Sequence, residues 1–159
     1  CKGPRRVLEV GPGTGAITQQ IVRELRPGDQ FDIVEINPDF VAFLGQRFAE
    51  EPEFRKRRGQ ARIMHMPLQE VPGERVYDFM ISGLPLNNFS LELVEDIYRS
   101  YERLLKPTGT LTCFEYVWIR EMKMPCVSES ERERLRKLTT YLEAKIRRHQ
   151  IGEEIVFLN

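Results

Sequence analysis

An apolar strand followed by a glycine-rich turn and a helical pattern constrains this chain more than any other feature. The stretch covers residues 7–22 and reads VLEVGPGTGAITQQIV, with three glycines at alternate positions. Glycines let the backbone approach a ligand closely, and the N-terminus of the following helix offers free N–H groups and a partial positive charge. The stretch therefore predicts a nucleotide-binding strand–loop–helix unit. Its loop consists of Gly11, Pro12, Gly13, Thr14 and Gly15.

Strand-like and helix-like segments alternate along the rest of the chain. Predicted strands cover residues 5–10, 30–36, 61–65, 77–82, 110–116 and 153–159. Predicted helices cover residues 14–25, 38–48 and 91–105, and a further helix begins after Ser128. Strands separated by helices predict a mostly parallel sheet with helices on both faces, a Rossmann-like α/β fold. We expect a single domain over residues 1–159, truncated at both ends, because Met does not begin the chain and the sixth strand ends it.

Composition narrows the classes of function. The chain has 159 residues, 41% hydrophobic and 30% charged, with a net charge of zero, which argues against a general polyanion binder. No apolar run reaches the roughly 18 residues of a membrane span, and no signal peptide is visible. Three cysteines without metal-ligand spacing predict a reducing compartment and no metal site. Basic blocks at residues 55–58 and 132–148 fit either a solvated surface or an anionic contact.

The residues around the glycines narrow the choice of ligand. A phosphate-binding P-loop needs Lys and Ser or Thr after its last glycine, whereas Ala16 follows here, and the dinucleotide fingerprint is met only through that alanine. Glu35 ends the second strand, where a carboxylate accepts hydrogen bonds from ribose hydroxyls in both nicotinamide and S-adenosylmethionine (SAM) enzymes. Glu9 lies inside the first strand, and a buried carboxylate needs a partner. The glycine-loop N–H groups or the amino group of SAM could supply it, which favours SAM.

Three segments, LEVGPGTGAIT, VEINPDF and ISGLPLNNF, together resemble class I SAM-dependent methyltransferases. They are most similar to bacterial phospholipid and ornithine-lipid N-methyltransferases, and the similarity extends through LLKPTGTLTCFEYVWIR to IVFLN. The resemblance implies SAM as cofactor, S-adenosylhomocysteine as product, and methyl transfer to the head-group amine of a membrane lipid. The rRNA adenine dimethylases are the alternative. Their Asn-Leu-Pro-Tyr motif holds a flipped adenine, but Gly83 and Leu86 stand at the Asn and Tyr positions here.

The resemblance and the strand ends together predict the site residues. The expected cofactor contacts are Glu9, Gly11, Pro12, Gly13, Thr14, Gly15, Glu35, Ile36, Met66, Pro67, Ser82, Gly83 and Leu84. No acid follows the third strand before Glu70, so we expect apolar packing of the adenine there. The expected catalytic residues, which would orient the amine or relay a proton, are Asn87, Glu115 and Tyr116. The expected lipid contacts are Pro85, Leu86, Trp118 and Arg120. His65 is a further candidate base or a structural histidine.

Residues 116–127, YVWIREMKMPCV, alternate aromatic or apolar groups with basic ones. This pattern suits the interface of an anionic membrane, and the other interpretation is a lid packed on the core. We expect a cytoplasmic protein bound peripherally to the inner face of the membrane, with no nucleic-acid partner. A nicotinamide-dependent oxidoreductase and a non-catalytic SAM- or lipid-binding domain remain open at this stage.

Overall fold

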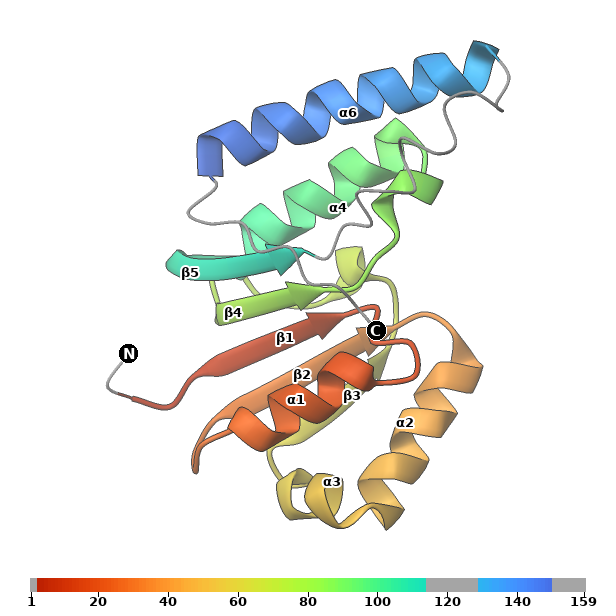
Figure 1. The fold of residues 1–159 in the computed structure, drawn as a ribbon. Helices are drawn as coiled ribbons and strands as arrows, with labels where there is room; N and C mark the ends of the chain where they lie inside the picture. The colour runs from red at the N-terminus through yellow and green to blue at the C-terminus, as the bar shows by residue number, and fades with distance from the viewer. Residues whose placement is uncertain (1–2, 114–128, 150–159) are drawn as a thin grey trace.

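The computed structural model describes residues 3–113 and 129–149, which form a parallel five-stranded sheet in the order β3-β2-β1-β4-β5 (Figure 1). The strands are β1 (Arg6–Val10), β2 (Gln30–Glu35), β3 (Ala61–His65), β4 (Tyr77–Ser82) and β5 (Leu105–Cys113). The helices are α1 (Ala16–Glu24), α2 (Pro38–Glu50), α3 (Pro52–Arg57), α4 (Leu91–Leu104) and α6 (Glu129–His149). Two short 3₁₀ turns are η1 (Leu68–Glu70) and η2 (Leu86–Asn88).

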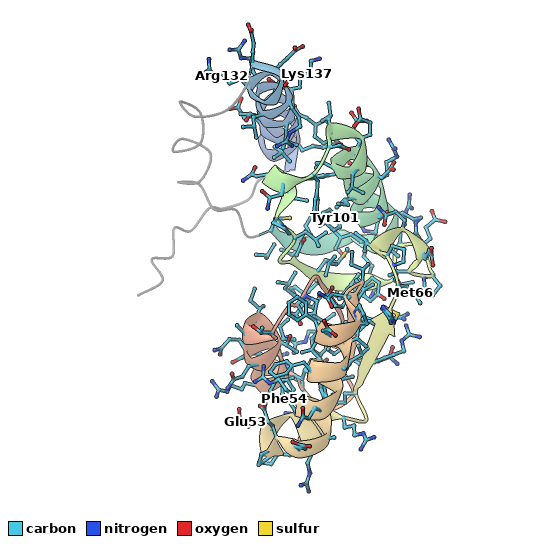
Figure 2. All side chains as sticks on the ribbon, turned by 90° about the vertical axis from the view of Figure 1, so that its right-hand side faces the viewer. Glu53, Phe54, Met66, Tyr101, Arg132 and Lys137 are labelled. Carbon is cyan, nitrogen blue, oxygen red and sulfur yellow. The ribbon has the colours of Figure 1, made fainter. Side chains whose placement is uncertain are left out.

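Helices cover both faces of the sheet, as the sequence predicts. Successive residues of a strand point to opposite faces, and in β1 the side chains of Val7 and Leu8 enter two different cores. Val7 packs in the layer that contains side chains of α1, α2 and α3, including the fully buried Phe54 (Figure 2). Leu8 packs in the layer formed by α4, α6 and the 3₁₀ turns. The sheet therefore lies between two apolar layers, each covered by helices, as in a Rossmann-like fold.

Helix α6 lies against α4 on the outer side of that second layer (Figure 1). Leu135, Leu138 and Leu142 form its apolar face, and all three are buried. Arg132 and Lys137 project from the exposed side of the same helix (Figure 2). This division of apolar and basic residues makes α6 amphipathic. No helix in the part of the chain that the structure describes is long and apolar enough to cross a membrane.

The structure corrects the predicted secondary structure in two places. Strand β5 begins at Leu105, directly after α4, whereas the sequence predicts a break at KPTG and a strand from residue 110. Tyr77 pairs with Leu105 and Phe79 with Thr110, so KPTG is absorbed as an irregularity in β5. The ammonium of Lys106 holds this segment to the Asp78 carboxylate at 2.8 Å. The predicted sixth strand over residues 153–159 lies outside the described residues.

Helix α3 is the second correction, because no helix was predicted between α2 and β3. Pro52 begins it, at a position where a helix needs no N–H donor. Phe54 supplies the burial that stabilises this short helix, at 0% exposure and edge-to-face with Phe48. The basic block at residues 55–58 therefore lies on and just after α3.

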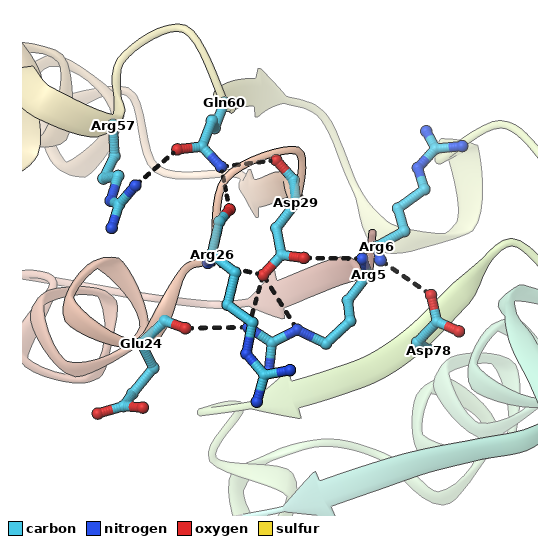
Figure 3. A network of polar contacts seen from close by, with 8 residues as sticks. All are labelled: Arg5, Arg6, Glu24, Arg26, Asp29, Arg57, Gln60 and Asp78. Carbon is cyan, nitrogen blue, oxygen red and sulfur yellow. Dashed lines mark hydrogen bonds and ion pairs between the residues drawn. The ribbon is translucent and has the colours of Figure 1, made fainter. Parts of the chain in front are cut away.

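A polar network closes the amino-terminal edge of the sheet (Figure 3). Asp29 accepts hydrogen bonds from the backbone and guanidinium of Arg5 and from the backbone N–H of Arg26. Gln60 donates to the carbonyl oxygens of Arg26 and Asp29 at 2.7 and 3.0 Å. Burial of the Asp29 carboxyl opposes its ionisation, but these hydrogen bonds outweigh that effect and lower its pKa to about 2. Charged and polar side chains therefore stabilise the amino-terminal ends of β1, β2 and β3.

Candidate functional site

The carboxyl ends of β2, β1 and β4 meet at the centre of the sheet. Strand order reverses between β1 and β4, and in open α/β sheets ligands bind outside the carboxyl ends at such a point. The N–H of Gly11 donates to the carbonyl oxygen of Val34 at 3.0 Å, and that of Gly83 donates to Val10 at 2.9 Å. These two bonds tie the loops that follow β1 and β4 to the ends of the strands.

The predicted glycine loop is present between β1 and α1. Gly11, Gly13 and Gly15 have φ values of 66°, 57° and 80°, in the left-handed region that favours glycine. The N–H of Gly15 closes the loop on the carbonyl oxygen of Pro12 at 3.0 Å. Helix α1 begins at the next residue. The alternation of glycines is thus explained by backbone conformation, and Thr14 is the exposed residue of the loop.

Glu35 connects the end of β2 to the glycine loop. One carboxylate oxygen accepts hydrogen bonds from the N–H groups of Ile36 and Asn37 at 2.9 Å each. The other accepts from the N–H of Gly13 at 3.3 Å. The side chain is therefore fixed beside the loop, at the place where the sequence predicts a ribose-binding carboxylate.

Glu9 is buried beneath the loop with one carboxylate oxygen unsatisfied. Its Oε2 accepts a 2.7 Å hydrogen bond from the Thr18 hydroxyl of α1, and its Oε1 has no hydrogen-bond partner among the described residues. Only 1% of Glu9 is exposed. Burial raises the pKa of Glu9 to about 7, the Thr18 hydrogen bond opposes the rise, and the charge of Glu35 adds to it. The loop N–H of Gly13 is engaged by Glu35 instead, so it does not supply a partner for the free oxygen of Glu9.

An apolar surface lies beside Glu35. Ile36, directly after the buried strand β2, is 67% exposed. The Nε2 atom of His65, at the end of β3, lies 3.1 Å from the carbonyl oxygen of Ile36 and joins the two strand ends. Met66 is half-buried against the core (Figure 2). Pro67 is exposed. His65 therefore has a structural contact, and Ile36, Met66 and Pro67 follow the carboxyl ends of the neighbouring strands β2 and β3.

The loop after β4 is anchored from α4. The Ser82 hydroxyl lies 2.6 Å from the Tyr101 hydroxyl, and both side chains are buried. The N–H of Leu84 also approaches the Ser82 oxygen at 3.4 Å. Burial raises the pKa of Tyr101, so the phenol stays neutral. The buried Ser82 hydroxyl thus links the start of the loop to Tyr101 of α4.

This loop also packs directly on the glycine loop. A Cβ added to Gly83 would lie 2.8 Å from the carbonyl oxygen of Gly11, closer than real Cβ contacts allow. A Cβ added to Gly11 would lie 2.6 Å from the Leu84 side chain. The structure therefore brings together the predicted residues of both loops, and it leaves no room for a side chain at position 83.

The turn η2 completes the loop. Pro85 is exposed, whereas the Leu86 side chain is 4% exposed and packs in the core. Arg134 of α6 donates hydrogen bonds to the carbonyl oxygens of Asn87 and Phe89. The backbone of Asn87 is therefore tied to α6. The remaining predicted site residues, Glu115, Tyr116, Trp118 and Arg120, lie outside the described residues.

Sequence reasoning missed three side chains that support the site: Arg47, Tyr101 and Arg134. Each comes from a helix far along the chain from the loop that it contacts. The spacing of apolar residues in a helix indicates which face is buried. It does not indicate which distant group a polar side chain will contact, so no sequence signal identifies these three residues. Within the described ranges, no cluster of His, Cys, Asp and Glu could hold a metal ion.

Comparisons with known proteins agree with this geometry. A family model described as a methyltransferase domain matches residues 7–109. An ornithine lipid N-methyltransferase of Singulisphaera acidiphila is 36% identical over 116 residues, which are 72% of this chain and 60% of that protein. A ribosomal RNA small subunit methyltransferase A of Synechococcus sp. (strain RCC307) is 37% identical over 101 residues, 64% of this chain and 35% of that protein. The chain thus spans less than two thirds of either relative.

The solved structures that resemble this chain include the 1,6-didemethyltoxoflavin-N1-methyltransferase of Burkholderia thailandensis with bound S-adenosylhomocysteine. The TM-score is 0.52 at 24% identity, over 69% of this chain and 44% of that one. This likeness concerns the fold. The family match covers the glycine loop, Glu35 and the loop after β4. The chain therefore belongs to the methyltransferase-domain family with the class I fold, and SAM is its methyl donor.

Proposed function

We propose that this protein transfers methyl groups from SAM to the head-group amine of a membrane lipid of the phosphatidylethanolamine or ornithine-lipid type. The observation that carries the proposal is the contact between Gly83 and the carbonyl oxygen of Gly11, which excludes a side chain at 83. The loop therefore lacks the amide with which adenine dimethylases hold their base. Leu86, at the position of their aromatic ring, is buried. An aliphatic amine needs neither group, and the ornithine-lipid relative supports the same substrate class.

We assign SAM to the carboxyl ends of β1 and β2. The ammonium of its methionine part fits the unsatisfied Oε1 of buried Glu9, since a buried carboxylate is costly without a partner. Glu35 would hold the ribose hydroxyls through a carboxylate that the loop already orients. Ile36, Met66 and Pro67 would cover the adenine. Bound SAM supplies a methyl group activated by its sulfonium sulfur.

The substrate amine must be unprotonated to accept the methyl group. An alkyl ammonium resembles that of Lys, with a pKa of about 10. A desolvated pocket beside a cationic sulfur lowers that pKa, and a nearby base or water completes the proton removal. We assign the orientation of the amine to Asn87 and the acceptance of its proton to Glu115 and Tyr116. Ser82, through its bond to Tyr101, fixes the loop along which the amine approaches.

The lipid contacts are proposed for Pro85, Trp118 and Arg120, with Arg120 pairing with a head-group phosphate or carboxylate. The exposed basic residues of α6, including Arg132 and Arg136, would face an anionic membrane surface. We therefore propose peripheral association with the inner face of the membrane.

Methyl transfer with labelled SAM tests the proposal. The acceptors are vesicles that contain phosphatidylethanolamine or ornithine lipid, phosphatidylcholine vesicles as the control, and small-subunit rRNA. We expect label in the amine lipids and none in phosphatidylcholine, whose nitrogen is already fully methylated. Label in the RNA would establish the second candidate, an rRNA adenine methyltransferase, which the Synechococcus relative favours. Label in neither acceptor would refute the lipid proposal.

A further inference from the structure

Arg47 of α2 reaches the glycine loop from outside the site. Its Nη1 atom donates hydrogen bonds to the carbonyl oxygens of Thr14 at 3.1 Å and Gly15 at 2.9 Å. A charged donor makes stronger hydrogen bonds than a neutral one. One guanidinium therefore holds two successive peptide groups of the loop, more than thirty residues away in the sequence.

The guanidinium is itself fixed by its surroundings. Its Nε and Nη2 atoms donate to the two carboxylate oxygens of Glu51 at 2.6 and 3.0 Å. Its centre lies 4.2 Å from the centroid of the buried Phe54 ring, in a cation–π arrangement. The side chain is only 13% exposed. The hydrogen bonds from Arg47 hold the pKa of Glu51 below its ordinary value, so the pair stays ionised at neutral pH.

The loop needs such a support because glycine has many accessible conformations. In a trans peptide the carbonyl and the N–H point in opposite directions, and the structure has no cis peptide bond among its described residues. When the carbonyls of Thr14 and Gly15 point at Arg47, the N–H groups of Gly15 and Ala16 must point away from it. A Cβ on Gly15 would lie 2.9 Å from Arg47 Nη1, so loop and guanidinium fit together without spare room.

We propose that Arg47 is a positioning residue that holds the glycine loop in its SAM-binding conformation. It acts on the cofactor through backbone carbonyls and needs no contact with SAM. A ligand binds more weakly when its competent conformation is only partly populated, so loss of this clamp weakens SAM binding. The proposal depends on SAM as cofactor and not on the identity of the methyl acceptor.

Calorimetric titration with S-adenosylhomocysteine tests the proposal in four variants. Arg47→Gln should raise the Kd about tenfold, which corresponds to ~1.4 kcal/mol. Arg47→Lys should bind more tightly than Arg47→Gln but more weakly than the wild type. Its ammonium can donate to a loop carbonyl, but it lacks the several N–H donors with which a guanidinium binds both the loop and Glu51. Glu51→Ala should raise the Kd by releasing the guanidinium. Arg23→Gln is the matched control, since it breaks an exposed ion pair with Glu53 in the same helical layer without touching the loop.

Unfolding midpoints without ligand, measured in parallel, separate a positioning role from a purely structural one. A lower midpoint for Arg47→Gln with a Kd within about twofold of the wild type would overturn the proposal. An equal rise in Kd for Arg23→Gln would also overturn it. If Arg47→Gln does not fold, Glu51→Ala decides in the same way: an unchanged Kd contradicts the proposal and a raised Kd supports it.

Discussion

The buried Glu9 carboxyl makes the stability of the ligand-free protein fall as the pH rises. Burial raises its pKa in the folded chain from the ordinary 4.5 to about 7. Between these values the unfolded chain has released the proton and the folded chain retains it, so each step up in pH favours unfolding. Below the lower value both states are protonated, and above the higher value both are ionised, so the effect is confined to that window.

The magnitude follows from the separation of the two pKa values. Each unit is worth about 1.4 kcal/mol, so ionised Glu9 costs about 3 kcal/mol in the folded chain at pH 8. The Thr18 hydrogen bond is already included in the shifted value. Glu9→Gln keeps the shape and an acceptor for Thr18 but cannot ionise. Its free energy of unfolding should therefore gain about 3 kcal/mol relative to the wild type between pH 4.5 and 8.

Urea unfolding of both proteins without ligand, at intervals across this pH range, measures the effect. The difference between the two proteins isolates Glu9, because all other titrating groups are shared. The same variant should bind SAM more weakly at pH 8, since it lacks the negative charge proposed to face the ammonium. Parallel pH profiles of the two proteins would show that the pKa of Glu9 is the same in the folded and unfolded chains, and this result would refute the reasoning.

Three further predictions concern other parts of the molecule. Asp29→Asn should lower the free energy of unfolding by about 2 kcal/mol at pH 7 and by little near pH 2, because the hydrogen bonds that lower this pKa are lost as the carboxyl is protonated; an equal effect at both pH values would contradict this. Gly83→Ala should cost about 1–3 kcal/mol in urea unfolding, because its Cβ collides with the glycine-loop backbone; a neutral effect would contradict the geometry. Arg134→Gln should lower labelled methyl transfer without changing the calorimetric Kd for SAM, and Arg99→Gln, which breaks an exposed ion pair with Asp96 on α4, should change neither; a weaker Kd for Arg134→Gln would refute its link to the loop after β4.

Local patterns predicted most of the fold. The strand–loop–helix unit at residues 7–22, the strand predicted over residues 30–36 and the strand that ends at Ser82 each combine an apolar run with flanking turn residues. All three are present, and the second ends one residue early, at Glu35. Helix α3 was missed because its stability depends on one buried ring, Phe54, rather than on a repeated pattern. The start of β5 was misplaced because Pro107 and Gly109 indicate a turn, whereas pairing with β4 keeps the segment in the sheet.

The candidate site was predictable only in its local parts. Glu9, the glycines and Glu35 were predictable because of their spacing from the end of a strand. The side chains that hold the site from a helix were not predictable, because their contacts join segments far apart in the sequence. Arg47 and Arg134 donate to backbone carbonyls. Every residue has such a carbonyl, so the identity of the accepting residue gives no sign of the contact. The three-dimensional structure is needed to show that two helices hold the two loops.

The central claim is that the carboxyl ends of β1 and β2 bind SAM through Glu35 and the glycine loop. Calorimetric titration of the purified protein with SAM and with S-adenosylhomocysteine tests it most directly, with NAD as the control ligand and Glu35→Ala as the control variant. The account predicts micromolar binding of both SAM ligands, no binding of NAD, and loss of affinity in the variant. Binding of NAD instead, or equal SAM affinity in Glu35→Ala, would contradict it.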